Sequence, residues 1–239
     1  MQSENYISQI MERIRGIVIR QIKYGEKEQI VDLFTDTHGR MSVIMKRGHM
    51  PLAMIEFDCN LHGQGKLPRP HNIVPYYTYR NIQFEPIKST LAMFTAEFLS
   101  NALREEMPDT LLYKYIEESL QWLDCTDCGI SNFHIAFLLH LSRFLGIEPN
   151  LEGHSSTQHF DMISGEYCSF QPKHPHFLRP EEARVIPYLS NMTISNMHLY
   201  RFSRKQRQRI LEILSDYYRI HIPNFHELKS LEVLKEIFD

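Results

Sequence analysis

The residues best able to do chemistry lie between positions 154 and 176, where histidines and a cysteine gather. Imidazole and thiolate are ligands that zinc prefers, and a neutral imidazole can act as a base. The group consists of His154, His159, Cys168, His174 and His176. Their spacing is irregular, and the chain has no HExxH, GxSxG or GxGxxG pattern. A metal-dependent enzyme using this segment is therefore an alternative. We expect instead a chain without catalytic residues, metal or cofactor.

Cys125 and Cys128 have the CxxC spacing of zinc ligands. A structural zinc site needs four ligands, yet no second CxxC or HxxxH pair follows in order. The chain's four cysteines are also too few and too scattered for a disulfide framework. We predict reduced thiols and no zinc at this pair. The run GQGK at 63–66 lacks the spacing of a phosphate-binding loop and predicts a hairpin turn.

A basic segment, RFSRKQRQR at 201–209, carries five positive charges in nine residues. At helical spacing, four of these side chains point away from the apolar face that Ile210, Leu214 and Tyr217 define. The four are Arg201, Arg204, Lys205 and Arg209. Either they form a solvated helix face, or they dock DNA or an acidic protein partner.

Cations and tyrosines are interleaved in the first third of the chain. Barrels of the oligonucleotide-binding (OB) type hold single strands with cations for the phosphates and aromatic rings for the bases. We predict a DNA-binding face composed of Arg20, Lys23, Tyr24, Lys27, Arg40, Lys46, Arg47, Lys66 and Arg80. Further tyrosines at 76, 77 and 79 fit this face, and they fit core or edge packing equally well.

The elements that carry these cations read as short strands. Glycine turns and apolar alternation, as in Met41, Val43 and Met45, favour a half-buried sheet. The expected strands cover residues 13–21, 28–36, 40–48, 55–63 and 73–81. Five such strands predict a small OB-fold barrel.

Near Glu85 the sequence pattern changes from that of strands to that of helices. Pro86 suits the first turn of a helix, Asp109 caps a second helix, and a third spans 131–145 before Gly146. Further helices are expected after Pro180, from Ser203 and at the chain's end. Two short strands around a Ser-Gly turn interrupt them. The prediction is an α+β chain with a barrel domain at 1–85 and a helical domain at 86–239, including a β-hairpin insertion near 152–178.

Composition and charge limit the class of protein. The chain has 239 residues, 43% of them hydrophobic, and a net charge of -3, which argues against a surface that is basic everywhere. Residues 1–85 hold eleven Lys and Arg against nine Asp and Glu, whereas 86–239 hold 15 against 20. The first part is therefore the expected nucleic-acid face. No run has the length of a membrane span, and we expect a cytoplasmic protein without membrane contact.

Three groups of short runs follow one another along the chain. The first is GIVIR at 16–20, YGE at 24–26, IVDLFT at 30–35, HGR at 38–40 and KRG at 46–48. The second is FLL at 137–139 leading to LGIEPNL at 145–151. The third is YYRIH at 217–221 followed by LKS at 228–230. Together, and in this order, these runs resemble the RecO family.

The resemblance implies a fold and a function. RecO-like proteins join an N-terminal OB barrel to a helical domain and are recombination mediators in DNA repair. They bind single- and double-stranded DNA, work with RecR and the single-stranded DNA-binding protein, help load RecA and anneal complementary strands. A protein adaptor whose barrel never touches DNA is a further alternative.

Two departures from the family pattern stand out. Many members carry a four-cysteine zinc site after the Gly-x-x-Pro-x-Leu turn, whereas residues 152–170 offer only Cys168. The family's basic loop after the third strand is also short here, because KRGHM at 46–50 runs almost directly into the next strand. We therefore expect the hairpin insertion to fold without metal.

Overall fold

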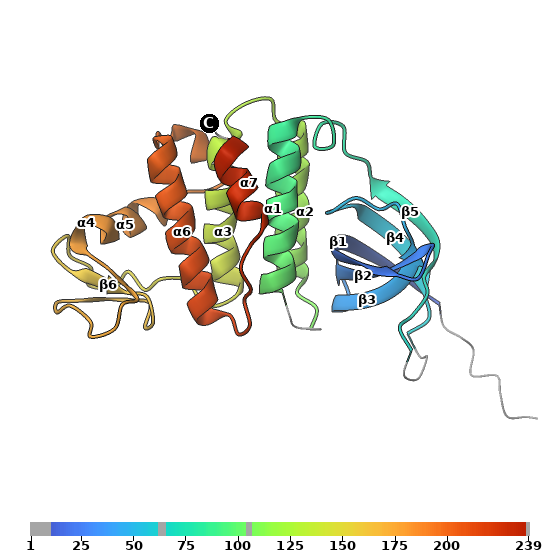
Figure 1. Ribbon diagram of the computed structural model, residues 1–239, viewed down its shortest axis with the longest axis horizontal. Helices are drawn as coiled ribbons and strands as arrows, with labels where there is room; N and C mark the ends of the chain where they lie inside the picture. The colour runs from blue at the N-terminus through green and yellow to red at the C-terminus, as the bar shows by residue number, and fades with distance from the viewer. Residues whose placement is uncertain (1–10, 62–65, 104–106, 238–239) are drawn as a thin grey trace, which may run out of the picture. The chain divides into compact units, whose positions relative to one another are not determined.

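The computed structural model describes residues 11–61, 66–103 and 107–237 (Figure 1). The chain forms two compact units, Met1–Gln121 and Trp122–Asp239. Each unit is described by itself below.

Unit 1 contains an antiparallel five-stranded sheet in the order β3-β2-β1-β4-β5. The strands are β1 (Glu12–Tyr24), β2 (Glu28–Thr35), β3 (Gly39–Lys46), β4 (Met54–Cys59) and β5 (His71–Tyr77). The sheet curls until β3 meets the segment before β5, where the amide of Ile44 donates to the carbonyl of Pro68 at 2.9 Å. This closure confirms the predicted OB-type barrel, visible in blue and cyan in Figure 1.

The barrel core is built from inward-facing apolar side chains. These are Ile14, Val18, Val31, Leu33, Val43, Met45, Ile55, Phe57 and Cys59. At Gly16 in β1, a Cβ atom would lie 3.3 Å from Leu33 Cβ, so glycine permits the close approach of the strands. Burial of this cluster is the main force that fixes the strand register.

The predicted end of the last barrel strand is wrong. Strand β5 stops at Tyr77, whereas the sequence suggested 81. The physical reason lies with Tyr79, which turns inward and donates its hydroxyl to the carbonyl of Leu52 at 2.8 Å. The predicted 63–66 turn lies outside the described residues, apart from Lys66.

Two helices follow the barrel, α1 (Pro86–Ala102) and α2 (Thr110–Cys125), and α1 packs against β1. Pro86 occupies the first turn of α1, and Asp109 Oδ1 accepts from the amide of Leu112 at 2.9 Å, as predicted for a cap. Helix α1 and most of α2 belong to unit 1. The domain boundary at residue 85 stays a prediction.

Unit 2 is mostly helical. Its elements are η1 (Ile130–Asn132), α3 (Phe133–Phe144), β6 (His159–Asp161), β7 (Glu166–Cys168), β8 (Phe177–Leu178), α4 (Pro180–Ala183), α5 (Val185–Leu189), η2 (Met197–Leu199), α6 (Arg204–His221) and α7 (Ser230–Ile237). The predicted hairpin is confirmed as β6 and β7, and β8 adds a third strand in the order β7-β6-β8. The fold class is therefore α+β, as expected.

Helix α6 is the longest helix of unit 2, and its start is sharply defined. Ser203 and Gln206 form a capping box, so the helix begins at Arg204. The helix is anchored at its other end by Tyr218, whose hydroxyl donates to the carbonyl of Leu138 in α3 at 2.7 Å. The sequence had placed Arg201 on this helix, and that was wrong, because the cap excludes it.

Hydropathy sets one further limit on the helices. Within the described ranges, no helix is both long enough and apolar enough to cross a membrane.

Candidate nucleic-acid interface

The end of the barrel formed by the β1–β2 turn and the last residues of β3 carries free positive charge. Cross-strand pairing of Glu28 with Lys46 places the end of β3 beside the turn. The side chains of Lys23, Lys27 and Lys46 are exposed and make no hydrogen bond or ion pair with another described residue. Tyr24, which lies between Lys23 and Lys27 in the sequence, is 46% exposed. We call Lys23, Tyr24, Lys27 and Lys46 the barrel-end group.

Arg47 holds this end of the barrel together. Its guanidinium donates to the carbonyls of Gly25 at 2.7 Å and Glu28 at 3.3 Å. Its backbone amide also donates to the carbonyl of Lys27. Arg47 therefore ties the β1–β2 turn to the end of β3. Its predicted role in DNA binding stays a prediction.

Arg40 lies in a different environment from the barrel-end group. Its guanidinium donates to Asp32 Oδ2 at 2.7 Å and to the carbonyls of Ser100 and Leu103 at 2.8 and 2.6 Å. Asp32 is buried and also accepts from Ser42 Oγ at 2.6 Å. Arg20 approaches the same carboxylate at 4.0 Å. This set, the Arg40 clamp, joins β2 and β3 to the end of α1.

Other cations of the barrel are neutralised by acids. Arg13 and Arg15 pair with Glu56, and Arg13 also pairs with Asp58. Hydrogen bonds from these guanidinium groups lower the pKa of Glu56, while Asn72 and Arg13 lower the pKa of Asp58. The carboxylates therefore stay charged and occupy the arginines.

Three more barrel cations are not members of the barrel-end group, although Arg69 lies beside it, because its partner Glu28 pairs with Lys46 across the strands. Arg69 binds the Glu28 carboxylate through two nitrogens, which lowers the pKa of Glu28. Lys66 is exposed directly after the undescribed segment 62–65, and Arg80 is exposed between β5 and α1. Of the nine predicted DNA-binding residues, the structure thus brings the four of the barrel-end group together with Arg47.

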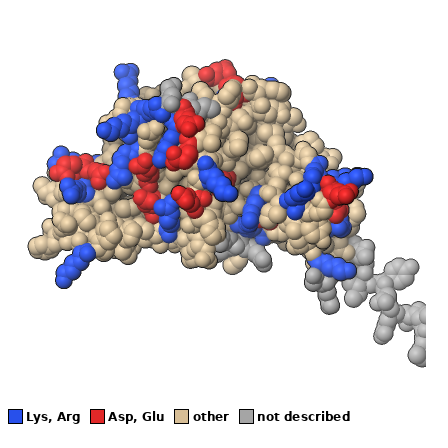
Figure 2. Space-filling model, viewed as in Figure 1, with Lys and Arg blue, Asp and Glu red and all other residues tan. Residues whose placement is uncertain are grey.

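The basic segment of unit 2 divides into paired and unpaired cations. Arg209 pairs with Glu182 at 2.7 Å and with Glu212 at 3.6 Å, and Arg204 donates to the carbonyl of Lys235. Arg201 and Lys205 are exposed and make no ion pair or hydrogen bond with any described residue. Figure 2 shows lysine and arginine side chains over the first turns of α6, with acidic side chains nearby.

An aromatic cluster next to this segment escaped the sequence analysis. The ring centroids of Tyr188 and Tyr200 lie 4.7 Å apart, and Phe202 lies 6.1 Å from each. Tyr188 is 53% exposed. The alternation of Tyr200, Arg201 and Phe202 was a visible signal, but Tyr188 joins them only through the fold.

The histidines of 154–176 are spread around the small sheet. His174 Nε2 lies 3.3 Å from Asp161 Oδ2, and the Cys168 thiol points at the carbonyl of His159. Burial raises the pKa of the Cys168 thiol, which disfavours the thiolate that a metal would need. In the described part of the chain, no three His, Cys, Asp or Glu side chains are placed to hold a metal ion.

Replacing both Cys125 and Cys128 with serine is expected to leave the fold intact. Both side chains are exposed at the end of α2, so little packing is lost. Loss of a structural zinc would instead remove about 10 kcal/mol or more of binding free energy. Thermal unfolding, with metal analysis of the unmodified protein, checks this. Stoichiometric zinc together with collapse of the variant would contradict it.

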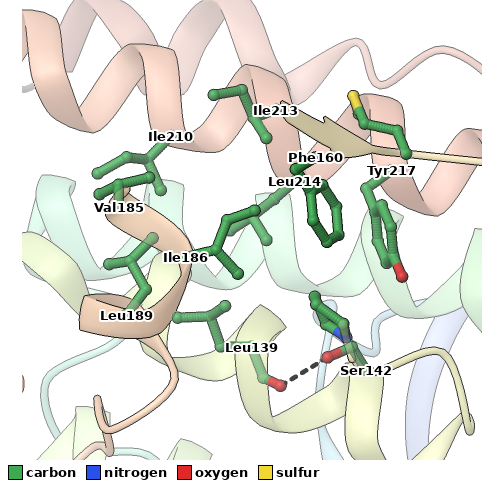
Figure 3. Close-up of a pocket in the computed structure, with 12 residues that line it drawn as sticks. Leu139, Ser142, Phe160, Val185, Ile186, Leu189, Ile210, Ile213, Leu214 and Tyr217 are labelled. Atoms are coloured by element: carbon green, nitrogen blue, oxygen red, sulfur yellow. Dashed lines mark hydrogen bonds between the residues drawn. The ribbon is translucent and has the colours of Figure 1, made fainter. Parts of the chain in front are cut away.

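An apolar groove lies within unit 2, between the small sheet and helices α3, α5 and α6. It encloses about 40 Å³ and is lined by Leu139, Ser142, Pro149, Phe160, Met162, Val185, Ile186, Leu189, Ile210, Ile213, Leu214 and Tyr217. Figure 3 shows these side chains gathered around the space, with the Ser142 hydroxyl donating to the Leu139 carbonyl. Because the Ser142 hydroxyl is bonded to the backbone, Ser142 is not positioned as a nucleophile. The lining of the groove suits apolar groups.

These features define an OB-barrel protein with a helical unit; cations without a partner among the described residues include those of the barrel end and, in unit 2, Arg201 and Lys205. Comparison with known families agrees. The family model described as "Recombination protein O N terminal" matches residues 10–54, and "Recombination protein O C terminal" matches residues 83–232. The chain belongs to the RecO family of DNA repair proteins.

Individual relatives match over nearly their whole lengths. The chain is 41% identical to DNA repair protein RecO of Phocaeicola vulgatus, covering 96% of this chain and 100% of that protein. It is 37% identical to RecO of Bacteroides fragilis with the same coverage. It is 32% identical to RecO of Flavobacterium psychrophilum, covering 95% and 98%.

Proposed function

We propose that this RecO-family protein is a recombination mediator that binds single- and double-stranded DNA through its barrel. The observation that carries the proposal is the barrel-end group, because its three lysines have no acidic partner among the described residues. Lysines that contact phosphates release counterions, and an exposed tyrosine beside them offers a stacking surface for a base.

The mediator binds strands and partners without making or breaking a covalent bond. Two features support this: the histidines of unit 2 are dispersed, and the groove has an apolar lining. Family membership further supports cooperation with RecR and the single-stranded DNA-binding protein, loading of RecA, annealing of complementary strands and a cytoplasmic location.

The basic segment before and within α6 is the proposed second contact. Arg201 and Lys205 are its available charges, whereas Arg204 and Arg209 already have partners. Both DNA and the acidic tail of the single-stranded DNA-binding protein would be attracted to such a surface.

Charge reversal of Lys27 and Lys46 to glutamate is expected to weaken binding of a single strand and to make it less dependent on salt. Each lysine that contacts a phosphate adds about 0.7 to the slope of log affinity against log salt, so the pair should lower the slope by about 1.4. Binding of a labelled oligothymidylate at several salt concentrations measures this. Arg47 is left unchanged because it holds the turn.

A control is Lys114→Glu at an exposed position of helix α2, which makes the same charge change at one residue and half the total change of the double variant. It should leave the slope nearly unchanged. A wild-type protein that does not bind the strand would favour the adaptor alternative. An unchanged slope in the Lys27 and Lys46 variant would place the strand elsewhere on the molecule.

A further inference from the structure

The aromatic cluster of unit 2 is unusual for a surface feature. Tyr188, Tyr200 and Phe202 pack at 4.7 to 6.1 Å, and Tyr188 keeps about half of its area in contact with solvent. Its ring is inclined by 53° to Tyr200 and 87° to Phe202. Tyr188 and Phe202 meet edge to face, and Tyr200 and Phe202 are half-buried, so the open aromatic surface is mainly that of Tyr188. Part of the aromatic surface is left for a ligand.

The segment that carries two of these rings is held rigidly. Asn132 is buried and donates to the carbonyls of Met197 at 3.0 Å and Tyr200 at 2.8 Å. Arg207 donates to the carbonyl of Phe202 at 2.7 Å, and the capping box of Ser203 fixes the next residues. The rings are therefore positioned before a ligand arrives, which lowers the entropic cost of binding.

Two exposed cations lie close to the cluster in the chain. Arg201 lies between Tyr200 and Phe202 in the chain, and Lys205 lies in the first turn of α6, where the helix dipole adds positive potential. Neither side chain is paired with a described residue. Burial, and in second place Tyr188, raises the pKa of the Tyr200 hydroxyl, so this ring stays uncharged beside an anion.

Rings and unpaired cations carried by one short segment, residues 200–205, match the chemistry of an unpaired nucleic-acid strand, in which bases and phosphates alternate. An acidic peptide would use the cations but leave most of the aromatic surface unused. We propose that Tyr188, Tyr200 and Phe202 form a stacking platform for the bases of a single strand, with Arg201 and Lys205 binding its phosphates. This platform rests on the proposed DNA-binding function and adds a second strand-binding site, in unit 2.

The test compares two ligands with the same backbone, an oligothymidylate and a strand of abasic sites. The double variant Tyr188→Leu and Phe202→Leu should bind the oligothymidylate roughly tenfold more weakly, within the range for loss of one stacked base. Its affinity for the abasic strand should not change. Two controls bind like the wild type: Tyr188→Phe, which keeps the ring, and Phe170→Leu, which removes an aromatic side chain that is 85% exposed and makes no ring contact with a described residue.

A photocrosslinking strand that contains 5-bromouracil provides a second readout. Crosslinks to the peptides around Tyr188 and Tyr200 support the platform, and crosslinks confined to unit 1 overturn it. Unchanged affinity in the double variant, or equal loss on both strands, also overturns it. So does a loss seen only for an oligoglutamate peptide, because the surface would then serve an acidic protein. If wild-type protein shows no binding to the oligothymidylate at all, the proposed function itself has failed.

Discussion

Replacing Arg40 with leucine should lower the free energy of unfolding of unit 1 by about 3 to 5 kcal/mol, the usual cost of removing one partner from a buried ion pair. The guanidinium satisfies Asp32, which is only 6% exposed, and two carbonyls at the end of α1. Without it, Asp32 would keep Ser42 and the distant Arg20. The Ser100 and Leu103 carbonyls would lose a charged donor.

Urea unfolding, followed by amide exchange in the barrel strands, measures the effect. Arg40→Lys should recover only part of the stability, because lysine lacks the planar fork that reaches several acceptors at once. The control Lys46→Leu removes an exposed, unpaired charge and should change the free energy by about 0.5 kcal/mol or less. If Arg40→Leu were as mild as this control, the clamp would have no structural role.

Acidification from pH 7 to pH 5 should destabilise unit 2 by about 2 kcal/mol through His134 alone. Burial, assisted by the charge of Arg207, lowers the pKa of His134 to about 3 from an ordinary value of 6.5. The ring is 2% exposed in α3. Below pH 6.5 the His134 ring therefore binds a proton in the unfolded chain but not in the folded chain. The contribution of His134 to the free energy of unfolding is greatest above this pH and falls as the pH drops.

The variant His134→Gln should reduce this dependence, since glutamine has no proton to gain in the window, whereas His140, whose pKa is also lowered by burial, keeps its own contribution. Urea unfolding at several pH values between 7 and 5 gives the comparison. This range lies above the titration of the ordinary carboxylates, which keeps Glu56 and Asp58 out of the measurement. Parallel stability curves for variant and wild type would mean that His134 is not the acid-sensitive group.

Local patterns in the sequence were sufficient to predict most of the elements, although not β8. Alternating apolar residues and glycine turns marked the five strands, and Pro86, Asp109 and Ser203 marked the starts of helices where the structure has them. These signals work because capping and periodicity depend on residues close together in the chain. The end of β5 was misjudged because a distant contact, from Tyr79 to Leu52, decides it.

Whether each cation is paired with an acidic side chain could not be predicted in the same way. Arg13 and Asp58 pair across strands that are far apart in the sequence, whereas Lys46 has no such partner in the described part of the chain. Cross-strand register decides between these outcomes, and it is set by packing of the whole barrel. The aromatic cluster was missed for the same reason, since Tyr188 meets Tyr200 and Phe202 only in the folded unit.

The closure of the barrel near Pro68 also bears on how copies of the protein behave at high concentration. An open sheet edge normally invites a strand from another molecule, because its amide and carbonyl groups lack partners. Here Pro68 and Pro70 flank Arg69 before β5, and Pro75 lies within β5. Proline has no amide hydrogen to offer an incoming strand. These prolines therefore make this edge a poor template for a strand from another molecule.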